Sequence, residues 1–468
     1  MVRFQNSGQY VLPYSFWEKI LTKERIDNDM IMIFQQTLWN RIRQSSLARD
    51  SFWALFGNIV NKGLALLAGI VIARFLGKEQ YGEYGMIKNT LLYIAVFSTF
   101  GLGFTSTRFV AQLKDQAKER LHSVITKSII ITLVFSGMMA AGVFAFSSRI
   151  ADYLEAPGLS LILKYTAVTV VFNALTATQI GILAGLHRFK ETARNNFIVG
   201  VITFLSGVVL TYYYGLDGAI IALMIANGFN CILNYATIKN TVGKSYPRST
   251  IKEKRMFREL LSFSLPIAMQ ESLFSVQYLI GTVMLVKLSN YGELGLYNAA
   301  GQWAAAILFI PSALQNVALS HLSETALDKS AHYSTFMTMI KINLISTIIP
   351  FICIAALSGV IVSLYGADYA GLRVVLIAAV SQTIIYCLLQ VYFQEFIALG
   401  RNWMIFTVRF VRDVLSLLLA YILLKMFDNN GALLFSIAHI VFNGLTLIVL
   451  WRLVALWNRP STPRHKVQ

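Results

Sequence analysis

The stretch RFLGKEQYGEYG at residues 74–85 ends a long apolar run, and a similar stretch, VKLSNYGELGLYN, occupies residues 286–298. Matched letter by letter, YGEYG of the first stretch lies over YGELG of the second at an offset of 210 residues. A shift of three residues aligns further pairs, which are Gly82 with Gly295, Tyr84 with Tyr297, Asn58 with Glu271 and Asn89 with Gln302. We prefer the shifted register because it aligns polar residues inside the apolar runs as well as the two stretches, which we expect to be turns. Gly82 and Gly295 are expected to permit the tight reversals there.

The composition is that of a membrane protein. Of 468 residues, 56% are hydrophobic and 13% are charged, whereas a soluble domain carries roughly 25% charged residues. The mean hydropathy is +0.60. Forty Lys and Arg against 23 Asp and Glu give a net charge of +17, but these basic residues lie between apolar segments. That pattern is typical of membrane topology, so no nucleic-acid partner is expected.

Twelve apolar segments have roughly the 20-residue length that crosses a bilayer core. Because lipid offers no hydrogen-bonding partner to the backbone, such segments must be helices. The sequence therefore predicts an all-α integral membrane protein with twelve transmembrane helices. The predicted spans are 52–75, 83–108, 123–147, 159–185, 193–214, 217–238, 262–288, 294–320, 337–364, 371–398, 403–426 and 431–454.

The distribution of Lys and Arg predicts the orientation of these spans. Twenty-nine lie in the termini and loops of one side, seven lie on the other side, and four lie inside spans. The excess places both termini in the cytoplasm. The two similar stretches are six helices apart, so the two halves share one orientation and form a parallel repeat.

The domain organisation follows from these spans. We expect a cytoplasmic extension at 1–50, six-helix bundles at 51–240 and 261–455, a basic linker at 241–260 and a basic cytoplasmic tail at 456–468. The extension lacks the features of a secretory signal peptide, so no removal is expected. Two interpretations of it stay open, which are an amphipathic helix on the membrane surface and a flexible extension or an upstream start codon.

Several stretches together resemble one protein family. The first helix ends in LGKEQYGEYG, the second ends in FGLGFTSTRFVAQ, and the seventh opens with LLSFSLPIAMQESLFSVQ. Over residues 52–454 these features resemble the Wzx-type polysaccharide flippases of the MOP exporter superfamily.

The resemblance implies an architecture and a function. It implies two six-helix bundles around a central cavity, alternating access, and translocation of an undecaprenyl-diphosphate-linked oligosaccharide (the O-antigen repeat unit is an example) across the bacterial inner membrane. The partners expected are this lipid-linked oligosaccharide, membrane lipids and other polysaccharide-assembly proteins. We expect a monomer.

Polar residues inside the spans are the candidates for a substrate-binding cavity. They are Asn58, Asn61, Lys62, Lys88, Asn89, Gln270, Glu271, Gln277, Asn298 and Gln302. A diphosphate needs cationic partners, and sugars need amide and hydroxyl partners. An alternative interpretation is an ion pair between Lys62 and Glu271 that holds the two halves together.

Two later spans carry further polar residues. Arg409, Arg412 and Asp413 in the eleventh span predict either a groove for the phosphate of the lipid or side chains that snorkel to the headgroups. Arg409 and Asp413 are one turn apart and could pair. Gln382, Tyr386, Gln390 and Gln394, with Glu395 adjacent, line one face of the tenth span, either as helix packing or as cavity wall. We interpret His439 and Asn443 as structural.

The spans contain candidate weak points but no catalytic motif. Pro266, Pro311, Pro350 and the stretch FGLGF at 100–104 are candidate weak points in their helices. No catalytic residue, metal site or cofactor is predicted, since no phosphate loop, HExxH motif or Cys-rich cluster occurs. Glu271 is the candidate for coupling to H⁺ or Na⁺. The alternative function is a cation-coupled multidrug exporter of the same superfamily.

Overall fold

The computed structural model describes residues 46–113, 118–153, 159–245, 254–312, 314, 322, 328–427 and 429–457, and these contain helices but no strand. The chain divides into two compact units, residues 1–54 and 55–468. Every contact discussed below lies within the second unit. Most of the predicted N-terminal extension, much of the basic linker and almost all of the C-terminal tail fall outside the described residues.

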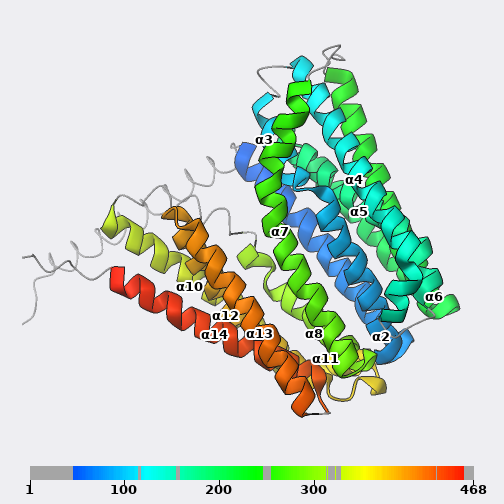
Figure 1. The fold of residues 1–468 in the computed structure, drawn as a ribbon, viewed down its shortest axis with the longest axis vertical. Helices are drawn as coiled ribbons and strands as arrows, with labels where there is room; N and C mark the ends of the chain where they lie inside the picture. Colours follow the sequence, from blue (N-terminus) through cyan, green and yellow to red (C-terminus); the bar gives the residue numbers. More distant parts are fainter. Residues whose placement is uncertain are drawn as a thin grey trace, which may run out of the picture. The chain divides into compact units, whose positions relative to one another are not determined.

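The described helices follow one another along the whole chain (Figure 1). They are α2 (Ser46–Thr99), α3 (Leu102–Leu113), α4 (Lys118–Tyr153), α5 (Leu159–Gly185), α6 (Phe189–Ser245), α7 (Lys254–Leu288), α8 (Tyr291–Ile307), α10 (Lys329–Ala356), α11 (Ser358–Tyr365), the 3₁₀ turn η1 (Ala367–Tyr369), α12 (Leu372–Ala398), α13 (Asn402–Met426) and α14 (Gly431–Trp457). Seven of them are long and apolar enough to cross a membrane. The predicted all-α membrane fold is confirmed.

Two of the long helices each contain two spans. Gly77 interrupts α2 with φ 71° and ψ 172°, and Gly215 interrupts α6 with φ 57° and ψ −132°. Only glycine adopts such backbone angles without steric penalty. When α2 and α6 are each counted as two spans, α3 continues the second span and α11 continues the ninth. The described helices then correspond to the twelve predicted spans.

The predicted weak points behave differently from one another. Phe100 and Gly101 have φ of 50° and 69° and separate α2 from α3, so the helix is interrupted at the candidate weak point FGLGF. Pro311 lies just beyond the C-cap residue of α8, Leu308, where that helix has already ended. Pro350, in contrast, lies inside α10 without interrupting it.

The reversals expected at Gly82 and Gly295 are in the wrong place, because both glycines lie inside helices. The first reversal occurs at Gly77. The second precedes α8, whose N-cap residue Asn290 accepts a hydrogen bond from the Glu293 N–H at 2.9 Å. The repeated glycines therefore have another role.

That role is a close approach between α2 and α8. A methyl group on Gly82 would overlap the Tyr291 carbonyl oxygen and lie 3.1 Å from the Gly295 nitrogen. A methyl group on Gly295 would overlap the Lys78 carbonyl oxygen and lie 3.3 Å from the Gly82 nitrogen. Lys78 and Tyr291 each precede their glycine by four residues, so the contact is reciprocal. This symmetry is what the shifted register of the repeat predicts.

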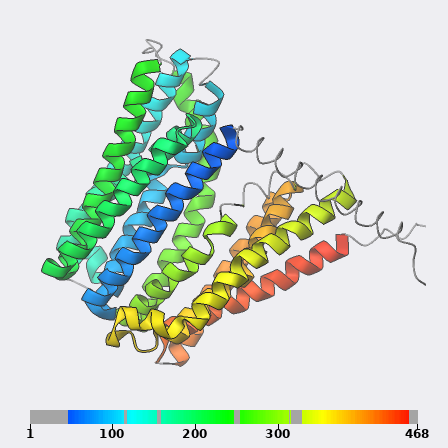
Figure 2. The same cartoon turned by 180° about the vertical axis from the view of Figure 1, so that it is seen from behind.

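Buried side chains extend this contact into a hydrophobic core. The core includes Tyr81, Leu296, Tyr365 and Tyr369, contributed by α2, α8, α11 and η1. The Tyr369 hydroxyl donates to the Ala73 carbonyl at 3.0 Å, just before the bend of α2. Burial raises the pKa of the Tyr369 phenol well above its usual range, so this donor stays protonated. Figure 2 shows the α11 and η1 segment, in yellow, beside that bend.

The seventh helix contacts both halves of the chain. Helix α7 packs against α3 and α4 of the first half as well as α8, α13 and α14 of the second. One of these contacts is a buried hydrogen bond of 2.7 Å between the Thr105 and Ser264 hydroxyls. Motion of one half relative to the other must therefore alter the surroundings of α7.

We predict that Gly82→Ala and Gly295→Ala each lower the free energy of unfolding by about 1–3 kcal/mol, because the added methyl group overlaps backbone atoms that cannot rotate away. Thermal unfolding of the protein purified in detergent measures this. Gly301→Ala is the matched control, since no atom lies within 4 Å of a methyl group there. It should be neutral or stabilising. Equal behaviour of the three variants would contradict the close approach.

Candidate functional site

The amides predicted to line the cavity meet where α2 packs against α8. Asn89 Nδ2 donates to Asn298 Oδ1 at 3.3 Å, and Gln302 Nε2 donates to the Tyr81 hydroxyl. The Asn298 side chain lies against Gly85, where a methyl group would overlap its Nδ2. The structure therefore brings these predicted residues together, but they hydrogen-bond across the helix contact.

The two predicted lysines are exposed. Lys62 Nζ lies 5.2 Å from the centroid of the Phe309 ring, and Lys88 Nζ lies 5.9 Å from the Tyr84 ring centroid. Neither ammonium forms an ion pair with a side chain that the structure describes. Both remain accessible to an anionic ligand.

Of the other predicted cavity residues in this region, the structure describes the side chain of only one, Asn61. Asn61 is half-buried and its Oδ1 faces Gly200 of α6, 3.5 Å from a methyl group built there. The side chains of Asn58, Gln270 and Glu271 lie outside the described part of the structure. The alternative ion pair between Lys62 and Glu271 therefore stays a prediction.

Gln277 belongs to a different cavity, which we call the C-terminal pocket. It has a volume of about 400 Å³ and lies between α7, α12 and α13. Its lining residues are Val276, Gln277, Ile280, Tyr386, Gln390, Phe393, Ile397, Ile405, Phe406, Arg409, Phe410, Arg412, Asp413, Val414 and Leu417. Tyr386 and Gln390 thus form cavity wall, one of the two interpretations of the polar face of the tenth span.

The charges of the C-terminal pocket are largely buried. Arg412 pairs with its neighbour Asp413, with Nη2 and Nε at 2.6 and 2.8 Å from Oδ1. The Arg412 side chain is only 11% exposed, so its snorkelling to the headgroups is not observed. Asp413 is thus paired with Arg412, and the Arg409 guanidinium stacks 4.1 Å from the centre of the Phe393 ring.

The pocket has unused hydrogen-bonding capacity. Arg412 Nη1 and Gln390 Oε1 are buried and have no hydrogen-bond partner among the described residues. Two guanidiniums and one carboxylate line the pocket. An unsatisfied cationic donor in an apolar environment is costly, so an anionic group entering the pocket would be stabilised there.

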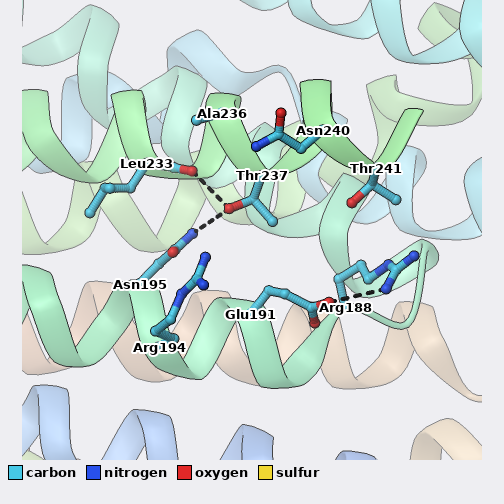
Figure 3. A pocket seen from close by; sticks show the side chains of 9 residues that line it. All are labelled: Arg188, Glu191, Arg194, Asn195, Leu233, Ala236, Thr237, Asn240 and Thr241. Carbon is cyan, nitrogen blue, oxygen red and sulfur yellow. Dashed lines mark hydrogen bonds and ion pairs between the residues drawn. The ribbon is translucent and has the colours of Figure 1, made fainter. Parts of the chain in front are cut away.

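A second pocket, which we call the N-terminal pocket, was not anticipated. It has a volume of about 340 Å³ and is lined by Arg188, Glu191, Arg194, Asn195, Leu233, Ala236, Thr237, Asn240 and Thr241 (Figure 3). Because α6 doubles back at Gly215, its first and last turns lie side by side. The three basic residues at 187–194 were used only to predict orientation.

A buried His–Glu pair also escaped the sequence-based prediction. His332 Nε2 lies 2.7 Å from Glu395 Oε1, and the two side chains are 13% and 6% exposed. They belong to α10 and α12 and are 63 residues apart. No local pattern joins them, so only the packing of the two helices reveals the pair.

His439 and Asn443 occupy structural positions, as the sequence suggested. His439 Nδ1 lies 2.9 Å from the Phe435 carbonyl oxygen of the same helix, and Asn443 is buried. Among the described residues no group of three His, Cys, Asp or Glu could hold a metal ion. The three cysteines, Cys231, Cys353 and Cys387, are free.

We predict a non-additive effect at the C-terminal pocket. Asp413→Ala should lower the free energy of unfolding by about 1–3 kcal/mol, because it leaves a largely buried guanidinium without its carboxylate. Arg412→Met removes the charge at similar volume and should cost less. The double variant should be more stable than Asp413→Ala alone in thermal unfolding. A double variant whose loss equals the sum of both single losses would contradict the coupling.

Comparison with known proteins gives a consistent result at the level of sequence families. Residues 47–324 match the family model described as polysaccharide biosynthesis protein. The EPS I polysaccharide export inner membrane protein EpsE of Ralstonia nicotianae is 23% identical over 421 residues, which are 86% of this chain and 94% of that protein.

Two further relatives match over shorter regions. The succinoglycan biosynthesis transport protein ExoT of Rhizobium meliloti is 22% identical over 56% of this chain, and the match spans about half (51%) of that relative. The lipid III flippase of Escherichia coli is 23% identical over 59% of this chain and 67% of its own length.

Solved structures share the fold at low sequence identity. A multidrug resistance MATE family transporter of the MOP superfamily, in its inward-facing conformation, gives a TM-score of 0.71 at 15% identity and covers 87% of this chain and 100% of its own. The outward-facing conformation gives 0.63 at 15% identity, with 88% and 96% covered. The TM-score is thus higher for the inward-facing conformation than for the outward-facing one.

Proposed function

The chain belongs to the polysaccharide biosynthesis protein family, and from that premise we propose that it is a flippase for a lipid-linked oligosaccharide. It is a multi-pass membrane transporter, not an enzyme, and it has the fold of the MOP superfamily. The proposed cargo is an undecaprenyl-diphosphate-linked repeat unit. It moves from the cytoplasmic to the outer leaflet of the bacterial inner membrane for surface polysaccharide biosynthesis, and both termini face the cytoplasm.

The C-terminal pocket is the observation that carries this proposal. Its wall is mostly aliphatic and aromatic, yet it is also lined by the guanidiniums of Arg409 and Arg412. A lipid diphosphate presents the complementary pair of features, an anionic group joined to a long apolar chain. Guanidinium binds phosphate oxygens through two parallel hydrogen bonds, and the apolar wall accepts the first isoprene units of the lipid.

The cargo's sugars need other partners. Gln277, Tyr386 and Gln390 add amide and hydroxyl groups to the same pocket, while Lys62 and Lys88 remain exposed on α2. We propose that the lysines attract the diphosphate as the cargo enters, since an accessible cation in a low-dielectric surrounding interacts strongly with an anion.

Alternating access is the proposed mechanism of translocation. The reciprocal contact of Gly82 and Gly295 joins α2 and α8 at the end of the molecule that the charge distribution predicts to be external. The higher similarity to an inward-facing transporter agrees with a closed external end. Opening would separate the two glycines and release the hydrogen bond from Tyr369 to Ala73.

A cation-coupled drug exporter is the alternative that the solved structures favour, since they are multidrug transporters of the same fold. Such a protein needs carboxylates in its cavity to bind cations. The intramembrane charges predicted in the first half are instead Lys62 and Lys88. Coupling of the flippase to H⁺ or Na⁺ is part of our proposal, with Glu271 as the candidate residue.

We predict that Arg409→Ala combined with Arg412→Ala reduces cargo translocation about tenfold to hundredfold, because two charge-assisted phosphate contacts are lost. A strain that lacks the chromosomal copy and any redundant flippase is complemented with each variant. The measurements are the surface glycan and the lipid-linked intermediate that accumulates on the cytoplasmic side.

Lys425→Ala is the matched control, since it removes an exposed cation from the other end of the same helix, α13. It should restore normal surface glycan. Normal glycan with the double arginine variant at equal protein level would show that the pocket is not needed for translocation. Normal glycan in the uncomplemented strain would overturn the flippase function itself.

A further inference from the structure

The N-terminal pocket combines a fixed floor with adaptable charged walls. Asn195 is almost fully buried and donates to Asn234 Oδ1 and Thr237 Oγ1, both at 3.0 Å. Thr237 donates in turn to the Leu233 carbonyl at 2.9 Å. Figure 3 shows Asn195 directed toward Thr237 across the space between the two ends of α6. This network ties the two ends together and keeps the pocket in shape.

The guanidiniums above that floor are available to a ligand. Arg188 Nη1 lies 3.0 Å from Glu191 Oε1, but the two side chains are 42% and 33% exposed, and such exposed pairs contribute only about 0–1 kcal/mol. Arg194 is exposed and forms no ion pair within the described residues. In Figure 3 its guanidinium lies beside Asn195. Both arginines line the pocket, so an anionic headgroup that enters it meets two exposed cationic side chains.

The pocket lies at the end of a membrane span. Residues Phe189–Val242 form one of the long apolar helices, and the pocket is built from its first and last turns. The charge distribution predicts that this end faces the cytoplasm. Basic pockets between helices at this depth are where anionic lipid headgroups bind.

An apolar surface continues from the pocket toward the middle of the span. Phe197 and Ile198 follow Arg194 by three and four residues, and Ile232 precedes Ala236 by four, so they lie on the same helix faces one turn deeper. These three side chains are 50%, 36% and 63% exposed. A free inorganic anion would not contact this apolar surface, whereas the acyl chains of a lipid would cover it.

We propose that the N-terminal pocket binds the phosphate headgroup of an anionic phospholipid, with the acyl chains along the exposed apolar face of α6. The site is separate from the C-terminal pocket and does not depend on the identity of the cargo. The bound lipid bridges the two ends of α6, one from each of the spans that meet at Gly215.

Native mass spectrometry of the full chain in detergent tests this proposal. The probes are phosphatidylglycerol and phosphatidylcholine, added together, and the readout is the ratio in which the protein retains them. We expect the ratio to favour phosphatidylglycerol. Arg188→Ala and Arg194→Ala should each lower it about fivefold, since one cation near a membrane surface contributes about 1 kcal/mol.

A variant with the opposite expected effect distinguishes a specific change in lipid binding from misfolding. Glu191→Gln removes the carboxylate that competes for Arg188, so it should raise the ratio about twofold to fivefold. Arg452→Ala is the control, since Arg452 is exposed on α14 and outside the pocket, and it should leave the ratio unchanged.

Three results would overturn the proposal. One is a ratio near unity for the unaltered protein. Another is an equal decrease of the ratio in Arg452→Ala and in the pocket variants, which would show that the anionic lipid is attracted to any exposed positive charge. The last is full displacement of phosphatidylglycerol by millimolar inorganic phosphate, which would identify the site as one for a free anion.

Discussion

The arrangement of the two halves depends on the contact between the backbones of α2 and α8 at Gly82 and Gly295. Any side chain at either position would push the helices apart, and the bonds that follow along the same two helices require their present separation. Asn89 meets Asn298 and Gln302 meets Tyr81 only because the glycines let the helix axes approach. The two glycines thus determine which polar groups of the first half face which groups of the second.

The C-terminal pocket shows how a membrane protein keeps charge inside an apolar fold. Arg412 is neutralised by the next residue in the chain, Asp413, and Arg409 is stacked on Phe393. The pair with Asp413 does not use all donors of Arg412, since its Nη1 remains without a partner among the described residues. Arginine suits this situation better than lysine because its flat, weakly hydrated head can stack on a ring and still bind an anion.

The sequence predicted the spans well because their lengths are fixed by the bilayer and their composition by lipid. It also predicted the register of the repeat, since glycines and amides recur at matching places in the two halves. The role of those glycines was misjudged, because a glycine needed for close packing and a glycine needed for a turn look alike in a sequence. Only the observed φ at Gly77 distinguishes them.

The site was less predictable than the fold. Gln277 was assigned to the same cavity as Asn298, yet it lies with Arg409 and Arg412 between α7, α12 and α13. The partner of His332 is 63 residues away. Helical spacing tells which residues share a face, but it does not tell which other helix that face meets, and this choice is made by packing across the whole bundle.

The glycine contact has a consequence for the rate at which the two halves can separate. The contact itself is formed by main-chain atoms, but the buried core around it, which includes Tyr81, Leu296 and Tyr369, must lose contacts when the helices part. Resistance to opening then comes from this core and from the hydrogen bonds that join the two halves, which are Tyr369 to Ala73, Asn89 to Asn298 and Gln302 to Tyr81.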